Sequence, residues 1–296
     1  MSRHHALASG PRGVVIARRE SFTAMINEED HLRLQVLKAG CQLRACAEQI
    51  DRIDTEIEAR VEYAFSPRFG YLTACPTNLG TGIRVSVMLH MPALKLTNQI
   101  DKFMNAAKDM NLAVRGLFGE GSEAASDLYQ ISNQVSLGVS ERHIVSEFES
   151  VIIPEIVEYE KAARRQLLTK DLDTLDDKIA RAMALLQNAH LISSQEALFL
   201  LSHLRLGLNM HEHMGASTPA IERLCALRAG TSTPAKGTAA APGCTGDPKL
   251  TIRAINRLFM LTLPAHLQVN YGKSLDATHR DALRAKIIRD ALTQQS

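Results

Sequence analysis

The stretch GYLTACPTNLGTGIRVSVMLH, residues 70–90, decides which fold the sequence predicts. Its first half is small, polar and rich in glycine, with Cys75 directly before a proline. From residue 83 onward, apolar and polar residues alternate, so that successive side chains face opposite sides of an extended chain. Ile83, Val85, Val87 and Leu89 face one side, and Arg84, Ser86, Met88 and His90 face the other. The stretch therefore predicts a tight turn followed by a β-strand that presents Arg84.

The flanking sequence adds further strands and helices. GVVIAR (13–18) and SFTAMIN (21–27) are short, rich in β-branched residues and close together, which predicts a hairpin. Helical spacing over 33–65 predicts a long amphipathic helix or a helix pair. Residues 96–111 are helical in pattern, while 112–118 and 128–138 are strand-like. A mixture of this kind predicts an α+β domain built on a sheet.

Beyond Ser140 the strand patterns largely stop. Residues 140–168 predict a helix with Ser140 as its N-cap, and Ser193 with Glu196 has the spacing of a capping box. Residues 228–249 are rich in Gly, Pro, Ala and Thr, which predicts a flexible insertion. Residues 277–292 form an amphipathic basic pattern, so an all-α C-terminal part is expected.

Bulk composition narrows the class of protein. The 296 residues are 45% hydrophobic, and 34 basic against 32 acidic residues leave a net charge of +2. This balance does not favour nucleic acid or a membrane surface as a partner. No apolar run approaches the roughly 18 residues of a spanning helix, and the first residues lack the apolar core of a signal peptide. Five cysteines without a CxxC pair favour neither a disulfide framework nor a zinc site, so we expect a cytoplasmic protein.

Two stretches bring acids and a thiol into consideration. NEEDHLRLQ (27–35) places Glu28, Glu29 and Asp30 side by side. The three carboxylates repel one another unless a cation is near, so they suggest a site for a positively charged group. A solvated turn before a helix is the plainer alternative. Cys75 lies before Gly80 and Gly82, which would let the backbone approach a ligand, although a structural cysteine in a sheet turn would look the same.

RGLFGEGSEA (115–124) forms the third candidate. Arg115 leads into three glycines with Glu120 between the last two, which suits a mobile loop that closes over a site. A glycine-rich surface loop is the alternative. The spacings of a P-loop or of a dinucleotide fingerprint are absent.

RDALRA (280–285) forms the fourth candidate. Arg280 and Arg284 are four residues apart on a predicted helix, so both could hold one phosphate. A basic helix with local pairing to Asp281 is the alternative. His211 and His213 are two residues apart near a loop, and no metal site is assigned to them.

Taken together, these residues suit one reaction. Arginines neutralise phosphates and the charge that develops on a transferring phosphoryl group. Carboxylates orient a guanidinium and can take its proton, and a partly ionised thiol adds negative charge nearby. The set predicts phosphoryl transfer to a basic acceptor.

The order and spacing of NEEDH, CPTNLGTGIR and RGLFGEGSEA resemble the catalytic domain of the ATP:guanido phosphotransferases, the family of creatine and arginine kinases. AFSPRFGYLTACPTNLGTG, HMPAL, GEGSEA, YQISNQVSLG and LSHLRLG are similar to its bacterial branch, the protein arginine kinases. The resemblance runs from about residue 13 to 292 and is interrupted around 228–249. It implies an antiparallel-sheet catalytic domain with flanking helices over 13–165, followed by a helical domain over 166–296.

The resemblance also implies roles for individual residues. Glu29 and Glu120 match the carboxylates that grip and deprotonate the acceptor, and Cys75 matches the active-site cysteine. The segments that match the nucleotide site are Arg33, Arg84, Val85, Ser86, Val87, Met88, Arg115, Gly116, Leu117, Phe118, Gly119 and Glu120. Arg280, Asp281, Arg284 and Ala285 match the family's RDxxRA motif, which binds phosphoarginine.

The resemblance implies ATP with Mg²⁺ as cofactors and proteins with exposed arginines as substrates. It further implies an activating zinc-binding protein, a Clp-type protease and a homodimer as partners. Family members carry an upstream segment with arginines that also clamp ATP, and nothing in this sequence matches it. Two alternatives therefore stay open: a non-catalytic phosphoarginine-binding adaptor or shortened inactive kinase, and a kinase of free guanidines.

Overall fold

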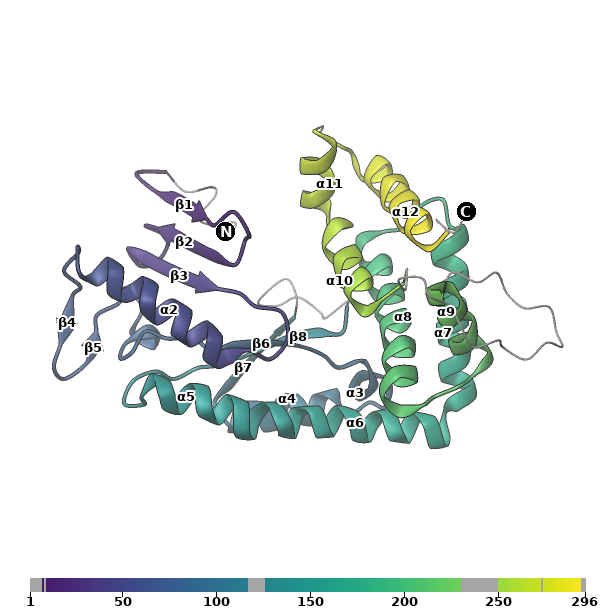
Figure 1. Ribbon diagram of the computed structural model, residues 1–296, viewed down its shortest axis with the longest axis horizontal. Helices are drawn as coiled ribbons and strands as arrows, with labels where there is room; N and C mark the ends of the chain where they lie inside the picture. The colour runs from purple at the N-terminus through teal and green to yellow at the C-terminus, as the bar shows by residue number, and fades with distance from the viewer. Residues whose placement is uncertain (1–6, 8, 117–125, 230–249, 273, 294–296) are drawn as a thin grey trace. The chain divides into compact units, whose positions relative to one another are not determined.

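The computed structural model describes residue 7 and residues 9–116, 126–229, 250–272 and 274–293 (Figure 1). The chain divides into two compact units. The first comprises residues 1–88, 104–114 and 130–158, and the second comprises residues 89–103, 115–129 and 159–296. The second unit therefore takes in three segments of the predicted catalytic domain, residues 89–103, 115–129 and 159–165, and the predicted boundary at residue 165 stays a prediction.

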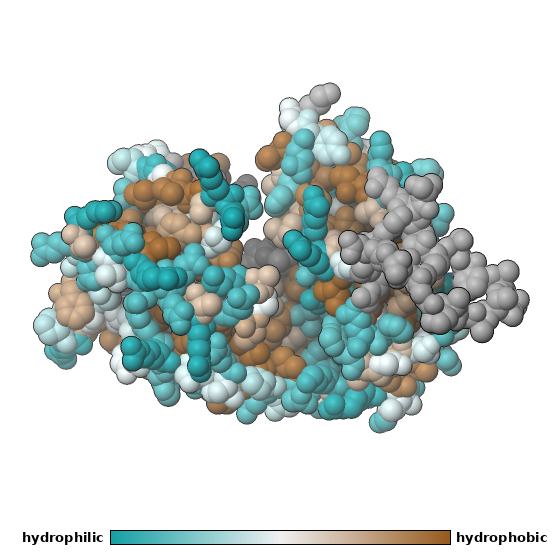
Figure 2. All heavy atoms as spheres, in the orientation of Figure 1, coloured by the Kyte–Doolittle hydropathy of each residue, from teal (hydrophilic) through white to brown (hydrophobic). Residues whose placement is uncertain are grey.

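The first unit begins with a three-stranded antiparallel sheet. Strands β1 (Gly13–Ile16) and β2 (Phe22–Ile26) form the predicted hairpin, with Val14 opposite Met25. Strand β3 (Leu32–Val36) pairs with β2, so that Met25 lies opposite Arg33. The helix predicted to begin at residue 33 was wrong at its start, because these residues complete the sheet and α2 runs only over Leu43–Glu58. Figure 2 shows apolar side chains gathered at the surface over β1–β3, where Val15 and Ile16 are exposed.

The quoted stretch forms two short strands and a turn. Strands β4 (Phe65–Ser66) and β5 (Gly70–Tyr71) pair antiparallel, and a single 3₁₀ turn (Pro76–Asn78) follows Cys75. Strand β6 covers only Ser86–His90. Arg84 was predicted to lie within the strand, but it lies before the strand begins. The pleat still holds for Val85, which is buried, and for Met88, which is exposed.

A second three-stranded sheet has the order β6–β8–β7. Strands β7 (Leu112–Gly116) and β8 (Leu128–Asn133) lie inside the predicted ranges. Strand β8 ends earlier than predicted, while residues 117 and 118, predicted to end the other strand, lie outside the described residues. Helices α3 (Pro92–Leu96) and α4 (Ile100–Asp109) connect β6 to β7. Antiparallel sheets and flanking helices together make the α+β architecture that was predicted.

The predicted helix after Ser140 is continuous but changes its hydrogen bonding midway. The Ser140 hydroxyl caps α5 (Glu141–Glu147) by accepting a bond from the His143 amide at 3.3 Å. A π-helical turn follows (Phe148–Ile152), in which the Ile153 amide bonds to the carbonyl of Phe148, and α6 runs over Ile153–Lys170. Pro154 explains this turn, because it has no amide hydrogen to donate four residues back.

The described C-terminal part is helical. It contains α7 (Leu172–Asn188), α8 (Ser194–Met214), α9 (Pro219–Ala229), α10 (Ile252–Leu261), α11 (Pro264–Tyr271) and α12 (Ala277–Thr293). Helix α8 is the buried centre, and the Ser193 hydroxyl caps it by accepting from the Glu196 amide at 3.2 Å. A Cβ on Gly207 of α8 would lie 3.0 Å from Leu224 and 3.1 Å from Ile179, so this glycine lets α7 and α9 pack closely.

The structure describes only the first residues of the predicted insertion. The first two residues of the predicted insertion, 228 and 229, end helix α9, and residues 230–249 lie outside the described residues. Over the described parts of the chain, every helix is too short or too polar to cross a membrane.

Candidate active site

The three adjacent acids lie in the turn between β2 and β3. Asn27 adopts a left-handed backbone conformation, and its amide donates to the carbonyl of His31 at 3.0 Å, which closes the turn. The side chain of Asn27 also bonds to the ring of His31. The acids therefore join two strands, and the alternative of a turn before a helix does not apply.

Each of the three acids has a different environment. The Glu28 carboxylate is only 10% exposed and pairs with Arg33 at 3.3 Å. Asp30 accepts the amide of Ala74 at 2.6 Å and the side-chain amide of Asn78 at 3.5 Å. Glu29 is exposed, and its carboxylate makes no hydrogen bond or ion pair with any part of the chain that the structure describes. Repulsion is thus relieved at Glu28 and Asp30, while Glu29 stays available to a cation.

Asp30 joins the acidic turn to the turn that carries Cys75. Ala74, which donates to Asp30, directly precedes Cys75 in the chain. The Cys75 carbonyl accepts the hydroxyl of Thr73 at 2.7 Å, and the half-buried thiol lies 3.0 Å from the hydroxyl oxygen of Thr77. This contact between Asp30 and Ala74 joins the chain neighbours of two predicted site residues, Glu29 and Cys75, which are 46 positions apart. The sequence analysis placed Asp30 in a possible cation site but did not predict this contact, because Ala74 lies 44 residues away.

Two glycines bring this turn against other backbone. Gly80 has a positive φ of 102°, and a Cβ there would lie 2.6 Å from the Ser136 carbonyl oxygen. A Cβ on Gly70 would lie 2.4 Å from the Gly80 carbonyl oxygen. The close approach predicted at Gly80 is therefore made to the protein's own backbone. Gly82 also has a positive φ, but a Cβ there would only touch the Asn78 carbonyl oxygen, at 3.9 Å.

The predicted nucleotide segment at 84–88 is held by an asparagine that the sequence analysis missed. Asn133 accepts the Val85 amide at 2.8 Å and donates to the carbonyls of Ile83 at 3.2 Å and Val135 at 3.1 Å. The Val85 amide thus bonds to a side chain, while the Val85 carbonyl still accepts the backbone amide of Asn133 at 3.3 Å, and β6 begins only at Ser86. Arg84 is exposed, Ser86 and Val87 are half-buried, and Met88 is exposed.

The remaining catalytic candidates lie around β7. Arg115 and Gly116 end this strand, and both are half-buried. They belong to the second unit, whereas Glu29 and Cys75 belong to the first. Leu117, Phe118, Gly119 and Glu120 lie outside the described residues. The role of Glu120 therefore stays a prediction.

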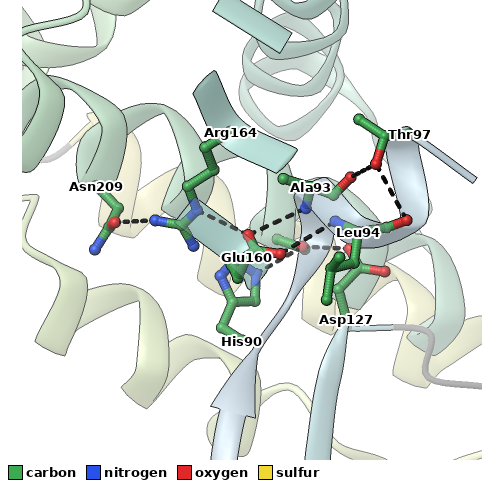
Figure 3. A network of polar contacts seen from close by, with 9 residues as sticks. His90, Ala93, Leu94, Thr97, Asp127, Glu160, Arg164 and Asn209 are labelled. Carbon is green, nitrogen blue, oxygen red and sulfur yellow. Dashed lines mark hydrogen bonds and ion pairs between the residues drawn. The ribbon is translucent and has the colours of Figure 1, made fainter. Parts of the chain in front are cut away.

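A buried polar network lies within the second unit (Figure 3). Glu160 accepts the amides of Ala93 and Leu94, each at 3.1 Å, and pairs with Arg164 at 2.7 Å. Arg164 also bonds to the side chain of Asn209. Burial raises the pKa of Glu160, while the bonds from Arg164 and the two amides oppose that shift. These contacts cap the start of α3 and fasten it to α6 and α8.

His90, which was predicted to share a strand face with Arg84, is buried and belongs to the same network. Its Nε2 lies 2.9 Å from the Ser202 hydroxyl, which donates to the Asp127 carboxylate at 2.5 Å. Because the Ser202 hydrogen goes to Asp127, the Ser202 oxygen accepts the Nε2 hydrogen of His90. Burial, followed by the charges of Arg205 and Arg164, lowers the pKa of His90 well below its ordinary value, so the ring is neutral. Lys95 completes the network by pairing with Asp127 at 3.2 Å.

The RDxxRA residues lie in α12, where the two arginines differ in burial. Arg284 is 1% exposed and donates to the carbonyls of Thr262 at 2.8 Å and Ile192 at 2.7 Å. It also pairs with Asp281 at 2.6 Å. Arg280 is half-buried and donates to the carbonyl of Leu275. The Arg284 guanidinium is thus occupied within the protein, and phosphoarginine binding by this motif stays a prediction.

Comparison with known proteins identifies the class. The profile of the ATP:guanido phosphotransferase C-terminal catalytic domain matches residues 1–163. The profile of the protein-arginine kinase McsB C-terminal domain matches residues 172–230 and 247–296, with a gap inside the predicted insertion. The chain belongs to the ATP:guanido phosphotransferase family.

Individual relatives show which branch of the family this chain is similar to. The protein-arginine kinase of Halothermothrix orenii is 41% identical over 292 residues, which are 99% of this chain and 74% of that protein. The protein-arginine kinase of Clostridium acetobutylicum is 38% identical over 94% of this chain and 72% of that protein. A crystal structure of lombricine kinase superimposes with a TM-score of 0.47 at 33% identity, over 52% of this chain and 43% of that protein. Within the family, the chain is similar to the protein-arginine kinases.

Proposed function

We propose that this chain transfers the γ-phosphate of ATP to arginine side chains of proteins. The observation that carries the proposal is that the three acids in the β2–β3 turn differ in whether the protein already bonds them. Arg33 neutralises Glu28, and the Cys75 turn occupies Asp30, so among the three acids only the exposed Glu29 has a carboxylate that no described residue bonds. The family match and the protein-arginine kinase relatives support the same activity.

In the proposed reaction, Glu29 accepts hydrogen bonds from the guanidinium of the substrate arginine and orients one of its nitrogens. That nitrogen attacks the γ-phosphorus, an N–P bond forms, and the bond from phosphorus to the oxygen of ADP breaks. The proton released from the guanidinium passes to a carboxylate, for which Glu29 and Glu120 are the candidates. Cys75 adds a polarisable sulfur beside the same cation.

The nucleotide requires positive charge. Arg33, Arg84 and Arg115 are the proposed cations for the phosphates, because charge accumulates on the equatorial oxygens as the phosphoryl group moves. Mg²⁺ would accompany ATP, held mainly by phosphate oxygens and water. Among the described residues, no cluster of three or more metal-ligating side chains is present.

The wider setting is part of the same proposal. Proteins with accessible arginines are the substrates, and the reaction belongs in the cytoplasm, where ATP is abundant and Cys75 stays reduced. A zinc-binding activator, a Clp-type protease that takes the marked proteins, and a second copy of the chain are proposed partners.

The test is incubation with Mg-ATP and casein, followed by mass spectrometry at near-neutral pH to preserve the N–P bond. We expect phosphoarginine from the wild-type chain and at least a hundredfold less from Glu29→Gln, because the amide cannot accept the proton. Glu155→Gln, an exposed acid on α6, is the matched control and should retain activity. Equal activity of Glu29→Gln and Glu155→Gln would remove Glu29 from the mechanism. Absence of product with the wild-type chain would favour the binding-only alternative.

A further inference from the structure

The hairpin β4–β5 carries an unusual concentration of aromatic side chains. The chain has only 13 aromatic residues, eight Phe and five Tyr, and four of them lie within nine positions: Tyr63, Phe65, Phe69 and Tyr71. Phe65 is 59% exposed and Phe69 is 41% exposed, so both rings reach the surface. Apolar rings held at a surface are typical of a binding site.

These rings line an open groove within the first unit. Phe65, Phe69 and Tyr71 line it from the hairpin, and Leu137 and Val139 line it from the segment after β8. Gly70 and Gly80 also line it, and their close backbone contact holds the hairpin against the turn that packs on the loop after β8. The rings also support one another, since Tyr71 makes edge-on contacts with Tyr63 at 5.8 Å and with Phe65 at 5.4 Å between ring centroids. The groove is therefore preformed.

The border of the groove is acidic. Helix α2 contains five acids and two arginines, and one of these, Arg44, pairs with Glu149. The Tyr63 hydroxyl donates to Asp54 at 2.9 Å, and the Tyr71 hydroxyl donates to Glu58 at 3.4 Å, so the rings and the acids form one surface. Glu141 lines the groove itself. Burial raises the pKa of Glu141, and the neighbouring carboxylates of Asp51 and Asp54 raise it further.

Arg68 also lines the groove and already contacts one of its rings. The guanidinium carbon of Arg68 lies 5.0 Å from the centre of the Phe69 ring. Arginine stacks on aromatic faces and donates two bonds to a carboxylate at once, whereas lysine offers a compact, strongly hydrated charge. Exposed rings beside carboxylates therefore suit an arginine side chain with an apolar neighbour.

We propose that this aromatic groove, lined by Phe65, Phe69, Tyr71, Leu137 and Glu141, docks arginine-containing apolar segments of protein substrates. The inference rests on the proposed function but concerns residues outside the candidate catalytic set. Tyr71 is four positions before Cys75, so a docked segment raises the local concentration of its neighbouring arginines near the acidic turn. The kinase would thereby prefer proteins with several arginines over those with one.

The first experiment measures binding without catalysis. A fluorescent peptide with two Leu-Arg pairs is titrated into the full chain carrying Glu29→Gln, and lysine and glutamate versions of the peptide are titrated in parallel. We expect Phe65→Ala and Glu58→Gln each to weaken binding of the arginine peptide about five- to tenfold. Tyr159→Ala is the matched control, because Tyr159 on α6 is also 59% exposed, and it should bind as before. Lysine binding equal to arginine binding would contradict a guanidinium site.

The second experiment separates docking from the reaction. On the background with Glu29 intact, Phe65→Ala should raise the KM for casein severalfold and leave kcat unchanged. If the wild-type chain forms no phosphoarginine, the proposed function fails, while the peptide titration still tests the groove. Unchanged peptide binding in both groove variants would overturn the docking proposal. So would a concentration-dependent dimer in sedimentation that Phe65→Ala abolishes without any effect on the peptide, because the groove would then join two copies of the chain.

Discussion

The acidic turn of the first unit and the buried polar network of the second use charged residues in opposite ways. In the turn, Glu29 is exposed and Arg33 keeps half of its side chain in solvent. In the second unit, Glu160, Arg164 and Arg284 are each less than 10% exposed, and several protein groups bond to each of them. Exposed charges are free to bind a substrate, whereas buried and satisfied charges hold helices together. Substitutions should therefore affect activity in the first region and stability in the second.

The largest stability effect is expected at Arg284. Arg284→Ala leaves the carbonyls of Thr262 and Ile192 and the carboxylate of Asp281 without their shared donor, which should cost about 3–5 kcal/mol of unfolding free energy. Urea unfolding measures the change. Arg280→Ala is the matched control on the same helix and should cost about 1 kcal/mol, because Arg280 loses one bond. Equal costs would mean that burial does not distinguish the two arginines.

Substitution of Asp30 should affect both stability and activity. Asp30→Asn keeps the shape but weakens the charge-assisted bond from the Ala74 amide, at a cost of about 1–3 kcal/mol. Phosphoarginine formation should fall with it, since the turn that carries Cys75 loses its tie to the acidic turn. Activity and unfolding should both be measured, with Asp109→Asn on α4 as the control. A loss of stability with full activity would separate the tie from the reaction.

The pH dependence of stability should follow His90. Its pKa is lower in the folded protein than in the unfolded chain, so below about pH 6.5 the unfolded state binds more protons. Stability is therefore fully present above that pH and is lost as pH falls, by up to about 1.4 kcal/mol for each pH unit. His203, whose pKa burial also lowers, acts in the same direction. Thermal melts from pH 7 to 5 should show a shallower slope in His90→Gln, and an unchanged slope would assign the effect elsewhere.

The smallest effect is expected for the pair of Arg33 and Glu28. Glu28→Gln removes an ion pair in which the Arg33 side chain is 52% exposed, so the unfolding free energy should fall by no more than about 1 kcal/mol. The KM for ATP should change more clearly, because Arg33 is a proposed phosphate ligand and Glu28 holds it. A large loss of stability without a change in KM would place this pair with the buried network instead.

Local features were predicted well wherever neighbouring residues decide them. The hairpin of β1 and β2, the Ser140 and Ser193 caps and the last helix all follow from turns, hydroxyls and periodicity within a few residues. Strand β3 was missed, because LRLQV becomes a strand only through its pairing with β2. The π-helical turn before Pro154 was also missed, although the proline itself was the available signal.

The sequence by itself determined the chemistry of this protein: the order of its acids, thiol and arginines, the family to which it belongs, and the α+β class. Tertiary structure alone decided which of these groups remain available. Asp30 is occupied by Ala74, 44 residues away, His90 by Ser202 on α8, and Arg284 by carbonyls of two other segments. The physical reason is that burial makes every charge and polar group take a partner, and those partners come from distant parts of the chain.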